Sequence, residues 1–385
     1  MGPVRDASGM NVRDNVLFAV LAGSFAMALA SGCDDASSSA KPATTATSTG
    51  TATATASATA KPLPPMPKAD PLPEKPKWAP EMKVPADNPI TAEKAALGKQ
   101  LFFDKSLSKD GSASCSTCHL PDKAWTDGEK LSKKVGGAMN TRHSPTMLNV
   151  GYAESLYWDG RGETLEKTVI AAWKNQLGAD PDKIAETIGK IPGYEVQFKT
   201  IFNANASADT IAKAVATFLR TLTTPDAPWD KISADASDKS KEAEAARRGF
   251  ALFRGKAGCA ACHAPPMFSD LTFHNVGIGY DKDVKEPDIG RGKISKNKED
   301  DGKFKTPNLR NVGMHAPYFH DGRAESLDAA VDYMLSGGLK NDNLDKQLKK
   351  VTLSKPERED LMAFLKSLEA PLPAFTAPQI PTASP

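Results

Sequence analysis

The stretch Cys115-Ser-Thr-Cys-His119 occurs a second time in the same form, as Cys259-Ala-Ala-Cys-His263. The pattern C-x-x-C-H is typical of covalent c-type haem attachment. Two thiols three positions apart can add to the two vinyl groups of one porphyrin, and the adjoining His can then bind the iron. A redox dithiol or a zinc site does not explain a His directly after both pairs. The predicted thioether residues are Cys115, Cys118, Cys259 and Cys262, and the predicted iron ligands are His119 and His263.

Length and charge fit a protein with two such haem groups. The 385 residues give room for two ordinary domains. The formal net charge is +2, and basic and acidic residues are mixed along the chain, so nothing indicates nucleic acid binding. Cys33 is the one cysteine outside the two motifs, which leaves no pair for a structural disulfide.

Residues 1–32 have the pattern of a lipoprotein signal peptide. The apolar run Val16 to Ala30 follows two arginines, as in secretory signals, and is too short for a membrane span. It ends at Leu29-Ala-Ser-Gly-Cys33, which resembles a bacterial lipobox with Cys33 as the lipidated residue. A plain secreted protein is the alternative. Either interpretation places the mature protein outside the cytoplasm, and we expect it in the periplasm. In the lipoprotein interpretation, the lipid anchor is the only membrane contact.

The rest of the chain predicts an all-α fold of two c-type cytochrome domains with long haem-wrapping loops, preceded by a disordered linker. The linker is rich in Ala, Thr, Ser and Pro, a composition that cannot bury enough apolar surface to fold. Each haem motif is preceded by an amphipathic helical pattern and a Gly-containing loop, which indicates an internal duplication. The predicted segments are a linker at 33–85, an N-terminal haem domain at 86–238, a C-terminal haem domain at 239–372 and a disordered tail at 373–385.

Capping residues predict where the main helices begin. Thr91 would cap the helix before the first motif, and Thr164 and Ser326 would cap later ones. Ser354-x-x-Glu357 forms a capping box that opens the last helix. Apolar spacing predicts two more helices, one through Ala243, Ala246, Phe250 and Phe253 and one through Ile211, Val215, Phe218 and Leu222.

These features resemble the bacterial di-haem cytochrome c peroxidases and the related methylamine-utilisation di-haem enzymes. The resemblance runs in family order from about residue 90 to 370. Besides the haem motifs it is carried by 101–104 (LFFD), 144–146 (SPT), 157–161 (YWDGR), 268–270 (FSD), 304–307 (FKTP), 309–311 (LRN) and 317–322 (PYFHDG). It implies that the N-terminal haem is the peroxide site and the C-terminal haem is the electron entry point.

The resemblance also implies roles for single residues. His119 and His263 would be the proximal ligands, and Met334 would be the distal ligand of the C-terminal haem, although its spacing alone also fits a core methionine. The methylamine-utilisation branch uses a Tyr as this ligand, but the register selects Met334 over its neighbour Tyr333. Trp158 matches the aromatic residue that relays an electron between the haems.

The first haem site departs from the family pattern. The loop 134–138 (KVGGA) has no His where many peroxidases have a distal ligand, so we expect an open iron site, with His143 as the nearest alternative ligand. Ungapped counting puts Thr168 and Gly178 where the family has a Gln and a proton-transferring Glu. Gln176 is the polar side chain expected to position peroxide.

We therefore expect a peroxidase that reduces hydrogen peroxide with electrons from a small cytochrome c or copper protein. The alternatives are a di-haem oxidase of the methylamine-utilisation type, which modifies a protein or small molecule, and a non-catalytic electron-transfer cytochrome. The family's calcium site uses an Asn where this chain has His143, so calcium would depend on carbonyls such as those of His315 and Pro317. A homodimer is common in the family, and the sequence leaves the oligomeric state open.

Overall fold

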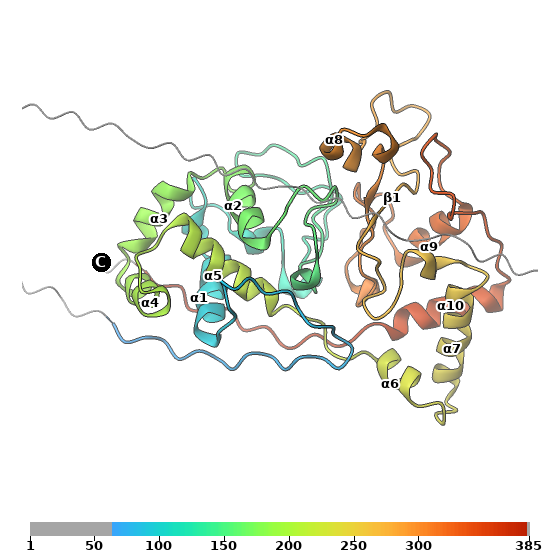
Figure 1. The fold of residues 1–385 in the computed structure, drawn as a ribbon, viewed down its shortest axis with the longest axis horizontal. Coiled ribbons are helices and arrows are strands. Elements are labelled where there is room, and N and C mark those ends of the chain that lie inside the picture. Colours follow the sequence, from blue (N-terminus) through green and yellow to red (C-terminus); the bar gives the residue numbers. More distant parts are fainter. Residues whose placement is uncertain (1–63, 383–385) are drawn as a thin grey trace, which may run out of the picture. The chain divides into compact units, whose positions relative to one another are not determined.

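The structure is a computed structural model that describes residues 64–382, which belong to one compact unit. The described chain is rich in helices and contains one antiparallel pair of two-residue strands (Figure 1). The predicted signal peptide, Cys33 and the linker up to residue 63 lie outside the described residues. Within residues 64–382, no helix has the length and apolar character needed to cross a membrane.

The helices and strands follow one another in a simple order. They are α1 (Ala92–Phe103), α2 (Leu165–Asn175), α3 (Pro181–Gly189), α4 (Pro192–Phe202), α5 (Ala208–Arg220), α6 (Pro228–Ala234), α7 (Lys241–Arg254), β1 (Phe273–His274), α8 (Arg291–Ser295), β2 (Phe304–Lys305), α9 (Leu327–Ser336) and α10 (Lys355–Ser367). The predicted caps are confirmed at α1, α2, α9 and α10, where Thr91, Thr164, Ser326 and Ser354 accept backbone N–H groups. Helices α3, α4 and α6 were not predicted, although each begins with a proline, a recognised start signal.

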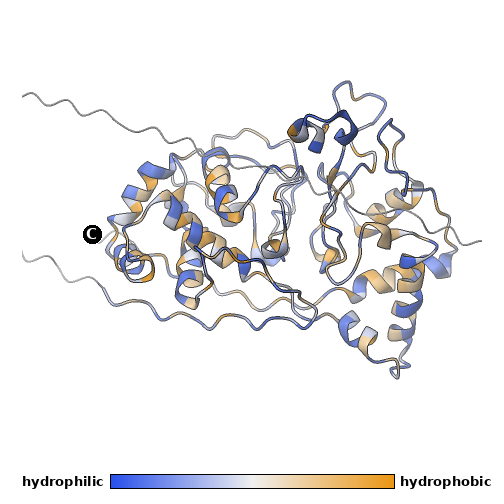
Figure 2. Ribbon diagram, in the orientation of Figure 1, coloured by the Kyte–Doolittle hydropathy of each residue, from blue (hydrophilic) through white to orange (hydrophobic). Residues whose placement is uncertain are grey.

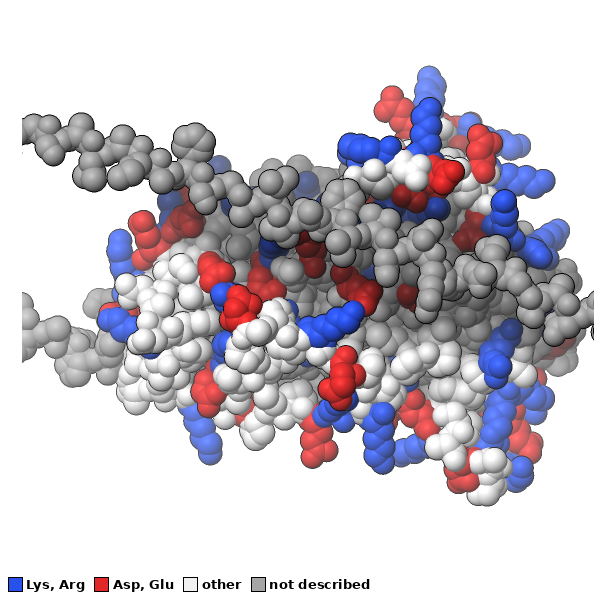
Figure 3. Space-filling model, viewed as in Figure 1, with Lys and Arg blue, Asp and Glu red and all other residues white. Residues whose placement is uncertain are grey.

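Apolar side chains form two main cores, one built from residues 97–222 and one from residues 229–368. We refer to the parts around them as the N-terminal half and the C-terminal half. Figure 2 shows the apolar faces of the helices turned toward one another within each half. On the face shown in Figure 3, acidic and basic side chains are interspersed, as the mixed sequence predicts.

Each half is organised around one tightly packed helix pair. Helix α1 packs on α5 at Gly98, where a Cβ atom would lie 1.9 Å from the carbonyl oxygen of Ala214. Helix α7 packs on α10 at Gly249, where a Cβ atom would lie 1.9 Å from the carbonyl oxygen of Asp360. Since neither carbonyl can yield without moving its helix, both glycines are required for the close approach of the backbones.

An aromatic pair follows at the same spacing in both halves. Phe102, one turn after Gly98, packs on Phe218 of α5 with ring centroids 5.4 Å apart. Phe253, one turn after Gly249, packs on Phe364 of α10 with centroids 4.9 Å apart. The two helix pairs therefore repeat one packing plan, consistent with the internal duplication expected from the sequence.

We expect Gly98→Ala to destabilise the protein by roughly 1–3 kcal/mol or more, because the added methyl group overpacks a backbone contact. The measurement is urea-induced unfolding of the holoprotein, followed by far-UV circular dichroism. Gly189→Ala is the matched control, because the nearest atom to a Cβ there is the Ala206 methyl carbon at 3.2 Å. Equal stability of the two variants would contradict this account of α1 and α5.

The chain also contains two similar stretches of sequence, one after each haem motif. Residues 144–165 read SPTMLNVGYAESLYWDGRGETL, and residues 306–327 read TPNLRNVGMHAPYFHDGRAESL. Both contain one antiparallel bridge at the same place, Leu156 with Gly162 and Tyr318 with Ala324. Both lead into a capped helix, α2 or α9, so equivalent positions on these two helices can be compared directly.

The two repeats bind each other through reciprocal backbone hydrogen bonds. The N–H of His143 donates to the carbonyl oxygen of His320 at 2.7 Å. The N–H of Lys305, which is equivalent to His143, donates to the carbonyl oxygen of Trp158 at 2.8 Å, and Trp158 is equivalent to His320. The halves are thus joined by a pseudo-twofold contact, and Trp158 lies in it.

Two segments predicted to be disordered pack on the folded part. Trp78, inside the predicted linker 33–85, is buried, and its indole N–H donates to the carbonyl oxygen of Thr224 at 3.0 Å. Phe375, inside the predicted tail 373–385, stacks on Phe103 with centroids 4.8 Å apart. The prediction of disorder therefore does not hold at Trp78 and Phe375, whose rings pack on residues that lie far along the chain.

Candidate functional site

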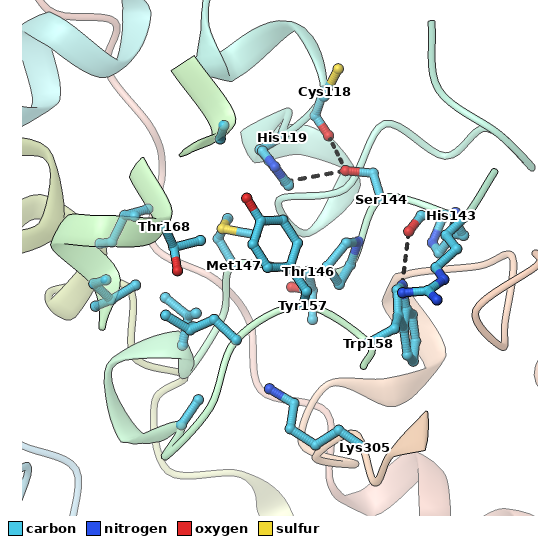
Figure 4. A pocket seen from close by; sticks show the side chains of 18 of the residues that line it. Cys118, His119, His143, Ser144, Thr146, Met147, Tyr157, Trp158, Thr168 and Lys305 are labelled. Carbon is cyan, nitrogen blue, oxygen red and sulfur yellow. Dashed lines mark hydrogen bonds between the residues drawn. The ribbon is translucent and has the colours of Figure 1, made fainter. Parts of the chain in front are cut away.

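A cavity of about 520 Å³ lies beside the first C-x-x-C-H motif (Figure 4). This volume is within the usual range of ligand and cofactor sites. Five residues predicted for the first haem site line it together: Cys115, Cys118, His119, Trp158 and Gln176. The structure therefore brings these sequence-predicted residues to one cavity.

Both motif histidines are oriented by a backbone carbonyl. The Nδ1 atom of His119 lies 3.1 Å from the carbonyl oxygen of Trp125, and that of His263 lies 2.9 Å from the carbonyl oxygen of Phe268. A carbonyl can only accept, so Nδ1 carries the proton and Nε2 keeps a lone pair for a metal. Burial lowers the pKa of both imidazoles, which favours the neutral form that binds iron.

The motif cysteines lie in short turns and are largely withdrawn from water. Each pair folds as a short 3-10 turn, Cys115–Thr117 in one half and Cys259–Ala261 in the other. Burial raises the pKa of Cys115 to about 12 and that of Cys259 to about 11. Burial in apolar surroundings disfavours the thiolate that a reactive redox dithiol uses. Together with the cavity and the free Nε2 of His119, the cysteines fit a covalently attached haem.

The wall of the cavity formed by α2 lacks the acid–base pair of the family pattern. Thr168 lines the cavity, and its buried hydroxyl has no hydrogen-bond partner among residues 64–382. Gly178 is not part of the lining. Asp159 is the only carboxylate among the described lining residues, and it is ion-paired with Arg142 at 2.6 Å and Arg161 at 2.9 Å. The described part of the cavity thus has no free carboxylate base.

Gln176 connects α2 to the loop that lacks the distal His. Its side-chain oxygen accepts from the amide of Asn140 at 2.9 Å, and its backbone oxygen accepts from Val135 N–H at 2.9 Å. Glu163 is exposed and paired with Lys167, as expected of a surface carboxylate. Glu166, on the first turn of α2, has a side chain that is only 13% exposed and binds Arg220 at 2.7 Å. The sequence does not reveal this buried ion pair because its partner lies far along the chain.

His143, the alternative distal ligand, lines the cavity and is held from two sides. Its Nδ1 donates to the carbonyl oxygen of Glu129 at 2.8 Å. Its own carbonyl oxygen accepts the indole N–H of Trp158 at 2.9 Å, as Figure 4 shows. Trp158 is therefore fixed to the N-terminal half by its side chain and to the C-terminal half through the Lys305 N–H.

Lys305 is a functional candidate that the sequence reasoning missed. It enters the first cavity from β2 in the C-terminal half (Figure 4). Its ammonium group donates to the carbonyl oxygen of Ser155 at 2.5 Å, and burial lowers its pKa to about 8. The similarity of residues 144–165 to residues 306–327 could have revealed it, because this alignment places Lys305 opposite His143, which also lines the cavity.

Met334 lies on α9, close to the C-terminal end of that helix. Leu327 and Val331 pack against the C-terminal core, whereas Met334 is not part of any apolar cluster within residues 64–382. The hydroxyl of the neighbouring Tyr333 donates to the carbonyl oxygen of Val276 at 2.9 Å. Aligning the two repeats places Met334 opposite Ala172 of α2, a small residue that lines the first cavity.

Comparison with known proteins places the chain among di-haem redox proteins. A family profile described as di-haem cytochrome c peroxidase matches residues 92–238. The chain is 41% identical to methylamine utilization protein MauG of Methylorubrum extorquens, over 77% of this chain and 84% of that protein. It is 36% identical to cytochrome-c peroxidase IdrP1 of Denitromonas iodatirespirans, over 75% of this chain and 85% of that protein. A solved MauG-like protein associated with microbial copper homeostasis superposes with a TM-score of 0.69 at 31% identity, covering 77% of this chain and 95% of that one.

Proposed function

The chain belongs to the di-haem cytochrome c peroxidase family, which includes the MauG proteins, and we propose that it reduces hydrogen peroxide to water in the periplasm. Haem c, when bound at the two sites, would supply the redox chemistry. His119 and His263 would bind the two irons, and the four motif cysteines would form the thioether bonds. We assign the two haem domains to residues 86–238 and 239–372, the bounds predicted from the sequence.

This proposal rests on one difference between α2 and α9, the helices that follow the two repeats. Met334 would supply a second iron ligand in the C-terminal half, whereas the equivalent Ala172 has no ligating atom. With this ligand the C-terminal site would be closed and suited to electron storage, while the N-terminal site would remain open for peroxide. The Tyr333 hydroxyl is already engaged with Val276, which supports Met334 as the ligand.

The remaining roles follow from the first cavity. Trp158 relays the electron, since it is hydrogen-bonded to both halves. Gln176 orients peroxide by hydrogen bonding. The donor is a small cytochrome c or copper protein, and each peroxide takes two electrons and two protons to give two waters. Anchoring through a lipid on Cys33 would keep the enzyme at the membrane.

A second candidate is an oxidase of the MauG type acting on a protein or small molecule, favoured by the 41% identity to MauG of Methylorubrum extorquens. The deciding experiment mixes the purified di-haem protein with peroxide and either reduced cytochrome c or a reduced copper protein. Peroxide-dependent oxidation of a donor, two equivalents per peroxide, supports the peroxidase. If neither donor is oxidised although both haems are present, the peroxidase proposal is wrong.

We expect peroxide turnover to fall as the pH rises through about 8, because Lys305 then loses the proton it can donate. Burial disfavours the charged amine, so its pKa lies below the usual lysine value, and the ammonium form exists only at lower pH. Because the described cavity has no free carboxylate, Lys305→Met should slow turnover by roughly 10- to 100-fold. The same variant should no longer show the decrease in turnover above about pH 8. Lys293→Met, which removes another lysine from the lining, is the control. An unchanged pH profile in Lys305→Met would exclude proton delivery by this residue.

A further inference from the structure

The described N-terminal segment crosses to the C-terminal half. In Figure 1 the blue chain before α1 runs along the N-terminal half and turns back near α6. Trp78, at this end, is 8% exposed and forms a small apolar cluster with Ala79 and Met267. Its ring faces the guanidinium carbon of Arg310 at 3.9 Å, a favourable cation–π geometry.

Arg310 connects Trp78 to the loop that orients His263. The arginine is 2% exposed, and its Nε donates to the carbonyl oxygen of Pro266 at 2.8 Å. Its terminal nitrogens bind both carboxylate oxygens of Asp230 at 2.9 Å, which fixes the guanidinium plane. Two residues after Pro266, Phe268 presents the carbonyl that accepts the His263 Nδ1–H at 2.9 Å.

The C-terminal tail makes the converse contact on the N-terminal half. After α10 the chain returns along the N-terminal half, where the carbonyl oxygen of Gln379 accepts from the Gln100 side chain at 3.1 Å. Phe375 packs edge-on against Trp125 with centroids 5.6 Å apart and an interplanar angle of 90°. Trp125 presents the carbonyl that accepts the His119 Nδ1–H at 3.1 Å.

We propose that these two segments are crossed positioning elements, in which Phe375 holds the carbonyl that orients His119 and Trp78 holds the loop that orients His263. Each terminal segment thus acts on the haem ligand of the half it does not adjoin in sequence. This inference rests on the proposed haem ligation by His119 and His263. Neither Phe375 nor Trp78 is a catalytic residue, because each acts only through another side chain.

The expected effect follows from the chemistry of the Nδ1–H···O=C bond. This hydrogen bond raises the basicity of the imidazole, and a more basic ligand stabilises ferric over ferrous iron. Loosening the carbonyl weakens the bond, so the midpoint potential of the affected haem should become more positive. The Fe–His stretching frequency of that haem in the ferrous state should fall.

The first test replaces Phe375 with Ala in the full-length holoprotein. Spectroelectrochemical titration should show a positive shift for the first haem and no shift for the second. Phe202→Ala is the matched control. Both Phe375 and Phe202 are half-buried rings beneath a lysine, Lys99 at 4.8 Å and Lys94 at 5.4 Å from the ring centroids, but the ring of Phe202 packs on Phe198 and not on Trp125. If Phe375→Ala fails to retain haem, Phe375→Leu takes its place, because leucine keeps part of the apolar contact. The midpoint potential of the first haem should then shift in the same direction by a smaller amount.

The second test replaces Trp78 with Ala, which should shift the second haem and leave the first unchanged. Trp78→Phe, which keeps a ring over Arg310, should restore the potential. Equal shifts of both haems in either variant, a shift in Phe202→Ala, or no shift at all would overturn the proposal. These potentials are measured without peroxide, so a lack of peroxidase activity would overturn the proposed function and leave this inference standing.

Discussion

Replacing Ala172 with Met is expected to close the first haem and abolish peroxide reduction. Ala172 occupies the position of Met334 in the second repeat, on a helix with the same cap and the same preceding turn. A thioether sulfur placed there would reach the distal side of the iron and exclude peroxide. Turnover should fall by about 100-fold or more, which corresponds to about 2.7 kcal/mol of activation free energy. The high-spin ferric EPR signal should be lost at the same time.

Ala171→Met is the control for this substitution. Ala171 is the preceding residue on α2 but is not part of the cavity lining, so the high-spin signal and the turnover should persist. A high-spin signal that survives Ala172→Met would show that the two repeats are not equivalent on the distal side. If the unaltered protein instead has two low-spin haems that change only on reduction, a distal ligand is already present, and His143 is the first residue to replace.

The features predicted from the sequence depend on local chemistry. A C-x-x-C-H motif holds all its donors within five residues, so nothing distant is needed to interpret it. Thr91 and Ser354 cap their helices because a side-chain oxygen reaches a backbone N–H three residues on. The resemblance then ordered these local elements, and the structure brings Trp158 and Gln176 to the cavity beside the first motif.

The features that were missed depend on contacts between distant residues. Glu166 reads as an exposed residue of a first helical turn until Arg220, on another helix, comes within 2.7 Å. Trp78 lies in a Pro-rich segment whose composition predicts disorder, and its burial depends on residues far along the chain, among them Met267 and Arg310. Lys305 lies in a family segment, but its entry into the first cavity depends on the pairing of the halves through Trp158.

The repeat of residues 144–165 at 306–327 combines local sequence information with information that only the structure provides. Its sequence match is visible in the chain, yet its functional meaning requires the structural equivalence of α2 and α9. Once the bridges at Leu156–Gly162 and Tyr318–Ala324 fix the register, the two distal positions can be compared residue by residue. The halves then differ where their proposed roles differ, with alanine at the reactive site and methionine at the electron-storage site.

The converse substitution, Met334→Ala, is expected to open the second haem. A methionine ligand raises the reduction potential of haem iron, so its loss should make the midpoint potential of the second haem more negative. A second high-spin ferric signal should appear in the EPR spectrum. Electron entry from the donor would become unfavourable, and donor-dependent peroxide turnover should fall by roughly tenfold or more, since each factor of ten corresponds to about 1.4 kcal/mol.

Two further variants separate ligation from packing at this position. Met334→His restores a ligating atom and should return the second haem to a low-spin state, with a potential below that of the unaltered protein because imidazole is the stronger donor to ferric iron. Leu335→Ala truncates the next residue of α9 and should leave both EPR signals unchanged. If Met334→Ala keeps a low-spin second haem, Met334 is a core methionine, and the closed site must use a different ligand. Tyr333 would then be the first candidate, which would favour the oxidase of the MauG type over the peroxidase.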